Sequence, residues 1–161
     1  MGKKEKEVMN ESAIGSTFEI SLRILLMLNQ LSPQIVDERQ IEMIDFISVY
    51  AADFGLLDEN LHGYGDYRYS EFPARKQPVA IALKNLVLDG YIKLNPTPVG
   101  YKYSILETGK EICNKLTSIY AGEYNLAVQT VANHFKIEDS SSMLREINRF
   151  TTQSLTEVKH E

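Results

Sequence analysis

The pattern of apolar residues in the first third of the chain predicts two helices, the first of them buried. Residues 17–31 have almost no polar face, and a helix that is apolar all round is usually central and buried. Ser32-Pro33 should end this helix, because the residue before a proline avoids the helical conformation. A second helix is predicted from Asp37, a favourable N-cap residue, to Ala52, since isoleucines recur along one face.

Residues 53–72, DFGLLDENLHGYGDYRYSEF, have no sustained hydrophobic period and are predicted to be a loop. A connection of this length is unusual unless it has a function or contains regular structure of its own. Its tyrosines, phenylalanines and arginine are residue types that dominate binding hot spots, although they could also pack inward around the next helix. We expect the segment to combine both roles.

The next segment predicts a helix followed by a β hairpin. An apolar stripe indicates a helix from about Pro73 to Leu88, and Gly90 is suited to the position just after its C-terminus. Alternating residues indicate strands at 91–94 and 101–105, separated by a proline-rich tip. This order of elements is typical of a winged helix, in which the hairpin is the wing.

Two further helices should complete the fold. Thr108 and Glu111 have the spacing of a capping box, which would open a long helix reaching about Phe135. A short helix is expected over 140–150. The predicted fold class is therefore mainly α, a winged-helix-like domain with a two-stranded β wing and additional C-terminal helices. The expected organisation is a flexible N-terminus at 1–16, a single domain at 17–153 and a flexible tail at 154–161.

Composition indicates a cytoplasmic globular protein. The chain has 161 residues, 43% hydrophobic and 24% charged, which suits one domain with a substantial core. No apolar run is long enough for a membrane span, and the charged N-terminus does not have the form of a signal peptide. The single cysteine, Cys113, excludes an internal disulfide and a cysteine-based zinc site.

Motifs that carry chemistry are absent or incidental. Asp53-Phe54-Gly55 spells the magnesium-binding motif of protein kinases, but no glycine-rich loop or catalytic loop accompanies it. Asp58, Glu59, His62 and Asp66 do not have the spacing of a calcium or zinc site. We therefore expect a non-enzyme without metal or cofactor.

Charge is distributed unevenly along the chain. Residues 17–67 carry nine acids against two bases, whereas residues 68–115 carry eight bases against four acids. The basic residues could position a DNA backbone, or they could form an ordinary solvated face. The candidates for backbone contacts are Arg75, Lys76, Lys84, Lys93 and Lys102. The net charge of −5 argues against strong DNA binding by the chain alone, and the apolar Ala80-Ile81 suits a protein partner better than base reading.

Several segments in order resemble the small middle component of bacterial ABC-three-component systems, which overlap the Lamassu group of antiphage defence systems. The resemblance is carried by residues 18–31, 44–63, 67–92 and 100–112. It implies a non-catalytic accessory subunit beside a large SMC-like ATPase and a nuclease-type effector, with partner contacts at 44–72 and on the helix after Pro73. The implied partner-binding residues are Phe54, Leu61, His62, Tyr64, Tyr67, Arg68, Phe72 and Ile81. The proline-rich wing tip and the charged N-terminus depart from the family's pattern.

Two functions stay open at this point. The first is a subunit that scaffolds the ATPase and the effector and reaches DNA backbone only within the complex, with no membrane partner. The alternative is a winged-helix transcription regulator that dimerises through the long helix over 108–135 and places two recognition helices on a palindrome. Tight binding of one duplex at physiological salt by the chain alone would favour the regulator.

Overall fold

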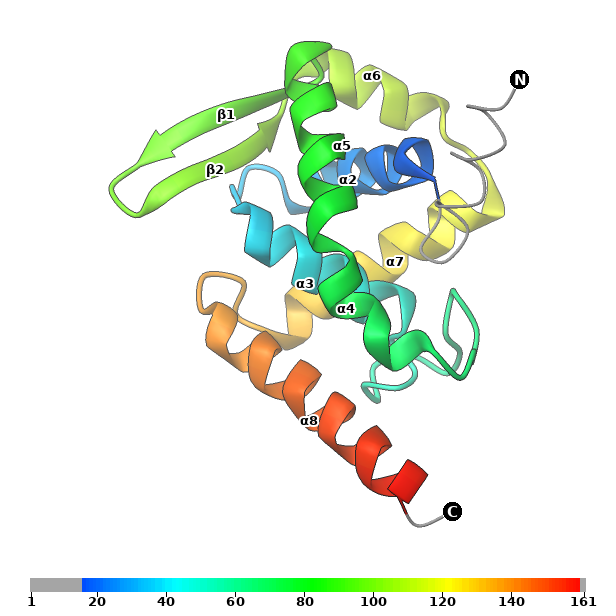
Figure 1. Ribbon diagram of the computed structural model, residues 1–161. Coiled ribbons are helices and arrows are strands. Elements are labelled where there is room, and N and C mark those ends of the chain that lie inside the picture. Colours follow the sequence, from blue (N-terminus) through cyan, green and yellow to red (C-terminus); the bar gives the residue numbers. More distant parts are fainter. Residues whose placement is uncertain (1–15, 160–161) are drawn as a thin grey trace, which may run out of the picture.

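The computed structural model describes residues 16–159 and shows a helical body from which a β hairpin projects (Figure 1). This confirms the predicted fold class: mainly α, with a two-stranded antiparallel hairpin and C-terminal helices, consistent with a winged-helix-like fold. The predicted flexible N-terminus lies, except for Ser16, outside the described residues. The elements are α2 (Thr17–Leu31), α3 (Glu38–Val49), η1 (Arg68–Ser70), α4 (Glu71–Ala74), α5 (Lys76–Leu88), β1 (Ile92–Thr97), β2 (Gly100–Ile105), α6 (Glu107–Lys115), α7 (Ile119–His134) and α8 (Ser140–Lys159).

Helices α2 and α3 form the centre of the core. The apolar pattern predicted this position for α2, whereas for α3 it indicated one apolar face only. Ser16 caps α2 by accepting a hydrogen bond from the Glu19 backbone, and Asp37 and Gln40 form a capping box at the start of α3. Helix α2 packs against α5, α6 and α7, while α3 packs against α5, α7 and α8. Burial on all sides explains why neither helix has a continuous polar face.

The hairpin joins the body through one of its two faces. Ile92 pairs with Ile105 at the base, and Leu94 pairs with Tyr103 further out. The Tyr103 backbone N–H also donates a 2.7 Å hydrogen bond to Val36, in the connection between α2 and α3, so that Val36 forms a bridge to β2. This bridge fixes the wing against the first two helices.

The helix predicted over 108–135 is two helices, so that prediction was wrong. Helix α6 ends at Lys115, and Ser118 starts α7 by accepting a hydrogen bond of 3.1 Å from the Ala121 backbone. Apolar residues continue at helical spacing across this break, so the periodicity of the sequence does not reveal it.

The predicted capping box at Thr108 was also wrong. Helix α6 begins at Glu107, and the Thr108 hydroxyl donates to the carbonyl oxygen of Gly90 at 2.5 Å instead. It therefore ties α6 to the turn before the hairpin. At the other end of the chain, α8 continues to Lys159, beyond the expected end at Phe150. Within the described part of the chain, no helix combines the length and the apolar character that crossing a bilayer requires.

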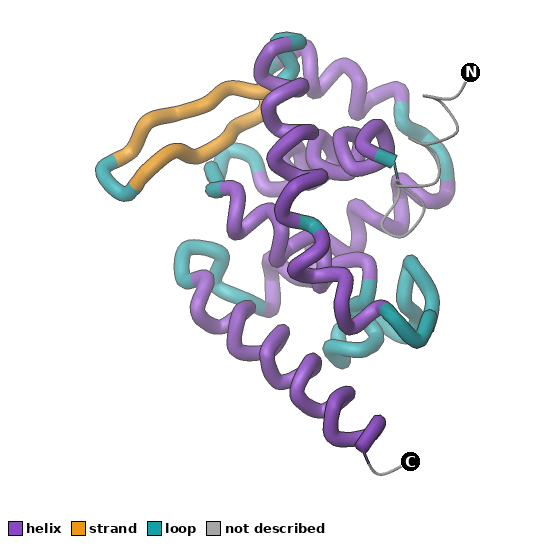
Figure 2. The backbone as a smooth tube through the Cα atoms, in the orientation of Figure 1, coloured by secondary structure: helices purple, strands orange, loops and turns teal. Residues whose placement is uncertain are grey.

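The segment predicted as a loop contains regular structure near its end. Residues 50–67 form turns, and η1 and α4 then lead almost directly into α5, so that the helical region starts a little before the predicted Pro73. The turns are the largest loop region in Figure 2. Their position beside the N-terminal part of α7 is fixed by the hydrogen bond between His62 and Tyr120.

Candidate partner-binding surface

The turns after α3 are folded around the side chain of Asn60, which is 8% exposed. Its Oδ1 accepts hydrogen bonds from the backbone N–H groups of Ala52 (2.9 Å) and Asp53 (3.1 Å). Its Nδ2 donates to Asp53 Oδ2 (2.8 Å) and to the Gly63 carbonyl (3.0 Å). Sequence reasoning missed this residue, although asparagine in a glycine-rich stretch is a signal for side-chain-stabilised turns.

Asp53 and Arg68 close the same segment with a two-point ion pair. Arg68 Nε lies 2.8 Å from Asp53 Oδ2, and Nη2 lies 3.2 Å from Oδ1. The guanidinium also lies 4.4 Å from the centre of the Tyr69 ring. Asp53 of the kinase-like triplet therefore has a structural role, and Arg68, a predicted partner residue, is engaged within the chain. Among the described residues, no three acidic, histidine or cysteine side chains gather where they could hold a metal ion.

Two of the predicted partner residues face the core. Phe54 and Phe72 pack on Phe46 with ring centroids 6.0 and 5.6 Å away, and Phe54 also contacts Phe150 of α8 at 5.1 Å. Phe72 is 8% exposed. These rings attach the loop and α8 to α3. Phe72 is buried there, whereas Phe54 stays partly exposed.

The other aromatic candidates divide between the surface and a hollowed region. Tyr64, Tyr67 and Ile81 are exposed, with Tyr67 the most open at 87%. Leu61 and His62 are half-buried and lie beside α7. The aromatic loop therefore combines packing and exposure, as its composition suggested. It places His62 and Leu61 at two separate hollows beside α7.

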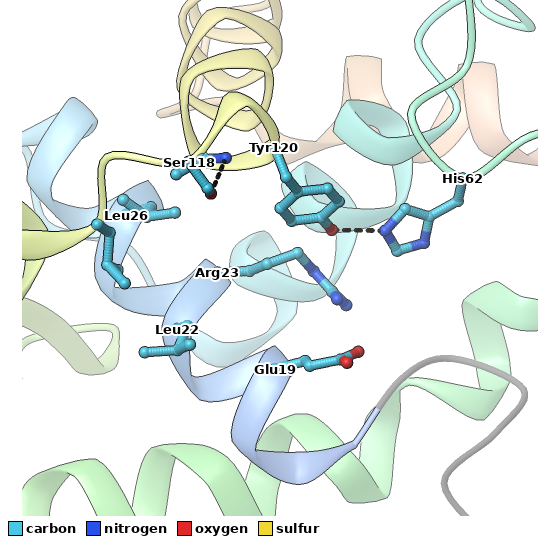
Figure 3. Close-up of a pocket in the computed structure, with 9 residues that line it drawn as sticks. Glu19, Leu22, Arg23, Leu26, His62, Ser118 and Tyr120 are labelled. Carbon is cyan, nitrogen blue, oxygen red and sulfur yellow. Dashed lines mark hydrogen bonds between the residues drawn. The ribbon is translucent and has the colours of Figure 1, made fainter.

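The first hollow, of about 280 Å³, lies between α2, α7 and His62 (Figure 3). A hydrogen bond of 2.7 Å joins His62 Nε2 to the Tyr120 hydroxyl, and the Arg23 side chain lies between this pair and Glu19. Burial, together with the nearby Arg23 charge, lowers the pKa of His62 to about 4, so the ring is neutral at physiological pH. The lining residues are Glu19, Leu22, Arg23, Leu26, His62, Leu116, Ser118, Tyr120 and Ala121.

A second hollow, of about 230 Å³, lies further along α7 on the side of the same loop. It is lined by Ser48, Leu57, Glu59, Asn60, Leu61, Glu123, Leu126 and Ala127. Both hollows thus use α7 as one wall and residues from 57 to 62 as part of another. At 100° per residue, the α7 residues that line the two hollows lie on different flanks of the helix. The name α7 face is used for the second hollow together with the exposed side chain of Ile119, which lies on the same side of α7 as Leu126.

A buried charge cluster lies next to the first hollow. Asp45 of α3 accepts hydrogen bonds from Arg23 Nε (2.9 Å), Arg75 Nε (3.0 Å) and the Tyr124 hydroxyl (2.7 Å). Burial by itself would raise the pKa of Asp45, but the two guanidinium groups hold that pKa well below its usual range. Burial likewise opposes the charge of Arg23, yet Asp45 raises the pKa of Arg23 above its usual value. The cluster fixes Arg23, which forms part of the first hollow.

The structure also sorts the five predicted DNA contacts. Arg75 is 1% exposed and bound to Asp45, so it is withdrawn from the set. Lys76 and Lys84 are exposed on α5, and Lys93 is exposed on the hairpin. Lys102 is half-exposed, and the strand register places it on the same hairpin face as Lys93.

Comparison with known proteins gives one family. The model of the family described as ABC-three component (ABC-3C) system Middle Component 2 matches residues 13–157. No curated protein and no solved structure matches the chain.

Proposed function

This chain belongs to the Middle Component 2 family of ABC-three component systems, and from that premise we propose that it is a non-catalytic accessory subunit of an antiphage defence complex. In that complex the subunit scaffolds an SMC-like ATPase and a nuclease-type effector in the cytoplasm. The observation that carries the proposal is the family match, which extends over residues 13–157 and so over the whole domain. The earlier resemblance in sequence points to the same kind of subunit.

The placement of reactive side chains supports a role without catalysis. Asp53 is held by Arg68 and Asn60, and Asp45 is held by two arginines and a tyrosine. Cys113 is buried, and burial raises the pKa of its thiol to about 11, so the thiol is not activated as a nucleophile. Both carboxylates are engaged by side chains of the same chain, and the thiol is buried. The α7 face, in contrast, has exposed apolar side chains suited to a protein partner.

Exposed lysines support a secondary contact with DNA backbone inside the complex. Lys84 on α5 and the pair Lys93 and Lys102 on one hairpin face can approach phosphates, because lysine contacts are the common means of positioning a duplex. With a net charge of −5 the isolated chain binds DNA weakly and in a salt-sensitive manner. The partner complex supplies the remaining affinity.

The structure removes the observation that favoured a transcription regulator. That hypothesis placed dimerisation on one long helix with an apolar face. Helices α6 and α7 are separate, and the apolar side of α7, with Tyr124, Val128 and Val131, is buried within the core. These observations favour the accessory subunit over the regulator.

The test is co-expression of the chain with the products of its two neighbouring genes, followed by affinity purification through a tag on this chain. We expect an ATPase and an effector to co-purify at physiological salt. Absence of both partners from the purified material, with the tagged chain folded, would overturn the proposal. Replacing Lys84, Lys93 and Lys102 by Glu should keep the complex assembled and reduce its DNA binding. Glu substitution of three lysines outside this surface, Lys110, Lys115 and Lys136, provides the matched control.

A further inference from the structure

We propose that residues 63–67 form a tip that places the Tyr67 ring in a recess of a partner protein, and that arginine or lysine lines this recess. The name tyrosine tip is used for residues 63–67. The inference rests on the proposed function and deepens it, because it assigns one contact of the accessory subunit and the chemistry of the partner's side. Three features of the tip support it: exposed rings, a backbone fixed by hydrogen bonds, and acidic charge.

The first feature is the exposure of two aromatic side chains. Tyr67 is 87% exposed and Tyr64 is 53% exposed. The loop that carries them lies at the edge of the helical body and away from the hairpin (Figure 1). Tyrosine is enriched among the residues that dominate protein interfaces, because its ring buries a large area while only two side-chain torsions become fixed. The Tyr67 ring is therefore in a position to enter a partner surface.

The second feature is the backbone of the tip, which is fixed although the Tyr67 ring is exposed. The Arg68 guanidinium donates hydrogen bonds to the carbonyl oxygens of Tyr64 (3.3 Å) and Gly65 (3.0 Å). The Ser70 hydroxyl donates to the Tyr67 carbonyl oxygen at 2.8 Å, and the Ser70 backbone N–H donates to the same atom at 3.1 Å. These bonds hold the tip in one conformation before any partner binds.

Glycines in the tip give this order its effect on binding. Gly63 has a φ of +79°, and glycine loses more conformational freedom on folding than any other residue. The Gly63 carbonyl oxygen accepts a hydrogen bond of 3.0 Å from Nδ2 of Asn60, the residue at the centre of the turns. Because folding has already ordered the tip, binding a partner costs less entropy than it would with a flexible loop. The fixed backbone therefore favours tight binding through Tyr67.

The third feature is the acidic charge beside the two tyrosines. Asp66 directly precedes Tyr67 in the chain, and Glu59 accepts a hydrogen bond of 2.7 Å from the Tyr64 hydroxyl. Both acids are exposed, and neither forms an ion pair with another residue that the structure describes. The rings are therefore bordered by negative charge that a basic partner can complement.

The rings and the acids together determine the chemistry of the partner. The charge of Arg68 does not offset that of Asp66, because Arg68 is engaged by Asp53 at 2.8 Å. A guanidinium group of the partner can lie on the Tyr67 ring and pair with Asp66, since arginine binds both aromatic faces and carboxylates. Apolar walls around it remove the ring from water, which contributes further free energy. A basic recess therefore fits the tip.

The same acids disfavour two other binding partners. Nucleic acid offers bases that stack on tyrosine, but Asp66 and Glu59 repel its phosphates. A second copy of the chain, docked symmetrically through the tip, would bring Asp66 close to its own equivalent, and like charges in contact oppose binding. A basic recess on a different protein satisfies both the ring of Tyr67 and the carboxylate beside it.

The test repeats the co-purification with variants of the tagged chain and measures how much of each neighbouring gene product is retained per tagged chain. Tyr67→Ala should reduce retention of one of these proteins at least about tenfold, because a buried anchor is lost. Tyr67→Phe keeps the aromatic ring and should stay within about threefold of the wild type. Tyr101→Ala, which removes a 63% exposed tyrosine from the hairpin, is the matched control and should leave retention unchanged. Equal retention by Tyr67→Ala and the wild type would overturn the inference.

Charge reversal tests the basic character of the recess. Asp66→Lys should reduce retention of the same protein about tenfold, because it places a cation opposite the partner's bases. Glu111→Lys, at an exposed acid of α6, makes the same charge change elsewhere and should have no effect. These positions are at the surface, and circular dichroism establishes that each variant is folded. Full retention by Asp66→Lys would overturn the basic recess.

Arg68→Met tests the fixed backbone separately from the ring. It removes the donors to the Tyr64 and Gly65 carbonyl oxygens and leaves Tyr67 in the chain. Retention should fall about threefold or more, because the tip must then be ordered by the partner. Arg149→Met, which breaks an exposed ion pair on α8, is the control. Unchanged retention by Arg68→Met would show that the fixed backbone does not contribute to binding.

The outcomes separate this inference from the proposed function. If the wild type retains its partners and Tyr67→Ala loses one of them while Tyr101→Ala does not, both proposals are supported. If both variants retain all partners, or lose them equally, the tyrosine tip is overturned and the accessory function stands. If the folded wild type retains no partner, the accessory function fails and the inference fails with it.

Two measurements on the chain alone test the other binding partners. Sedimentation as a dimer that Tyr67→Ala dissociates would overturn the inference, because a second copy would then cover the ring. Binding of a single-stranded oligonucleotide at physiological salt that Tyr67→Ala abolishes would overturn it as well. We expect a monomer without such binding.

Discussion

Arg75 Nε donates a hydrogen bond of 3.0 Å to Oδ2 of Asp45, a residue thirty positions earlier in the chain. The arginine is 1% exposed and the aspartate 2% exposed. Asp45 also accepts hydrogen bonds from Arg23 and from the Tyr124 hydroxyl. One carboxylate therefore connects α2, α3, α7 and the junction between α4 and α5. Arg75, which the sequence offered as a candidate DNA contact, is therefore part of the core.

Asp45→Asn should destabilise the protein strongly. Loss of the carboxylate leaves two buried guanidinium groups without their counter-charge, and removing one partner of a buried ion pair costs about 3–5 kcal/mol. Urea unfolding followed by circular dichroism measures the change. Asp66→Asn, at an exposed position, is the control and should change stability by less than about 0.5 kcal/mol. A small effect of Asp45→Asn would mean that the cluster does not stabilise the fold.

Folding stability should increase with pH across the range in which His62 titrates. Burial and the Arg23 charge lower the pKa of His62 from 6.5 to about 4 in the folded state. Between these values the unfolded chain binds a proton that the folded chain does not, so stability falls as the pH is lowered from 6.5 towards 4 and is fully present above 6.5. The unfolding free energy, measured at a series of pH values, should change less with pH over this window in His62→Gln than in the wild type. An unchanged slope in His62→Gln would show that His62 does not cause the pH dependence.

Arg68→Met should loosen the turns that form part of the α7 face. Methionine keeps much of the side-chain volume but leaves Asp53 without its two-point partner, at a cost of about 1–3 kcal/mol. Hydrogen exchange should accelerate more in residues 53–63 than in α2. The His62 amide, which donates a hydrogen bond to the Val49 carbonyl, is one of the groups that should exchange faster. Arg149→Met is the control, because its ion pair with Glu146 is exposed and worth little. Equal acceleration throughout the chain would show that the pair does not act locally.

Two glycine substitutions on helices should have opposite effects. A Cβ atom at Gly109 would lie 2.5 Å from the Tyr91 carbonyl oxygen and 2.8 Å from Ile105, so Gly109→Ala should destabilise the protein by about 1–3 kcal/mol. A Cβ atom at Gly122 meets nothing within 4 Å, and alanine there should stabilise α7 by about 0.5–1 kcal/mol. Thermal unfolding of both variants measures the difference. A lower melting temperature for Gly122→Ala than for wild type would contradict the second expectation.

The elements of the fold could be predicted because their signals are local. The apolar residues of 17–31, the cap at Asp37 and the glycine at position 90 indicate helices and turns through interactions with near neighbours. The break between α6 and α7 was not predictable in this way. Apolar residues continue at helical spacing on both sides of it, and Ser118 forms a cap only because α6 ends first.

The candidate site could be predicted only in part for a related reason. Sequence alone pointed to the aromatic loop and identified Leu61 and His62 as residues that could meet a partner. The tertiary structure decided that Phe54, Phe72 and Arg75 face inward, because their partners Phe46 and Asp45 lie on α3.

The sequence by itself determined a mainly helical domain with a hairpin, together with membership of its family. Only the tertiary structure placed Glu19 of α2 and His62 of the loop at one hollow beside α7, and residues 57–61 of the loop at another. The physical reason is the range of the interactions. Helix and turn formation depends on residues a few positions apart, whereas hollows and buried ion pairs depend on side chains that meet only when distant helices pack.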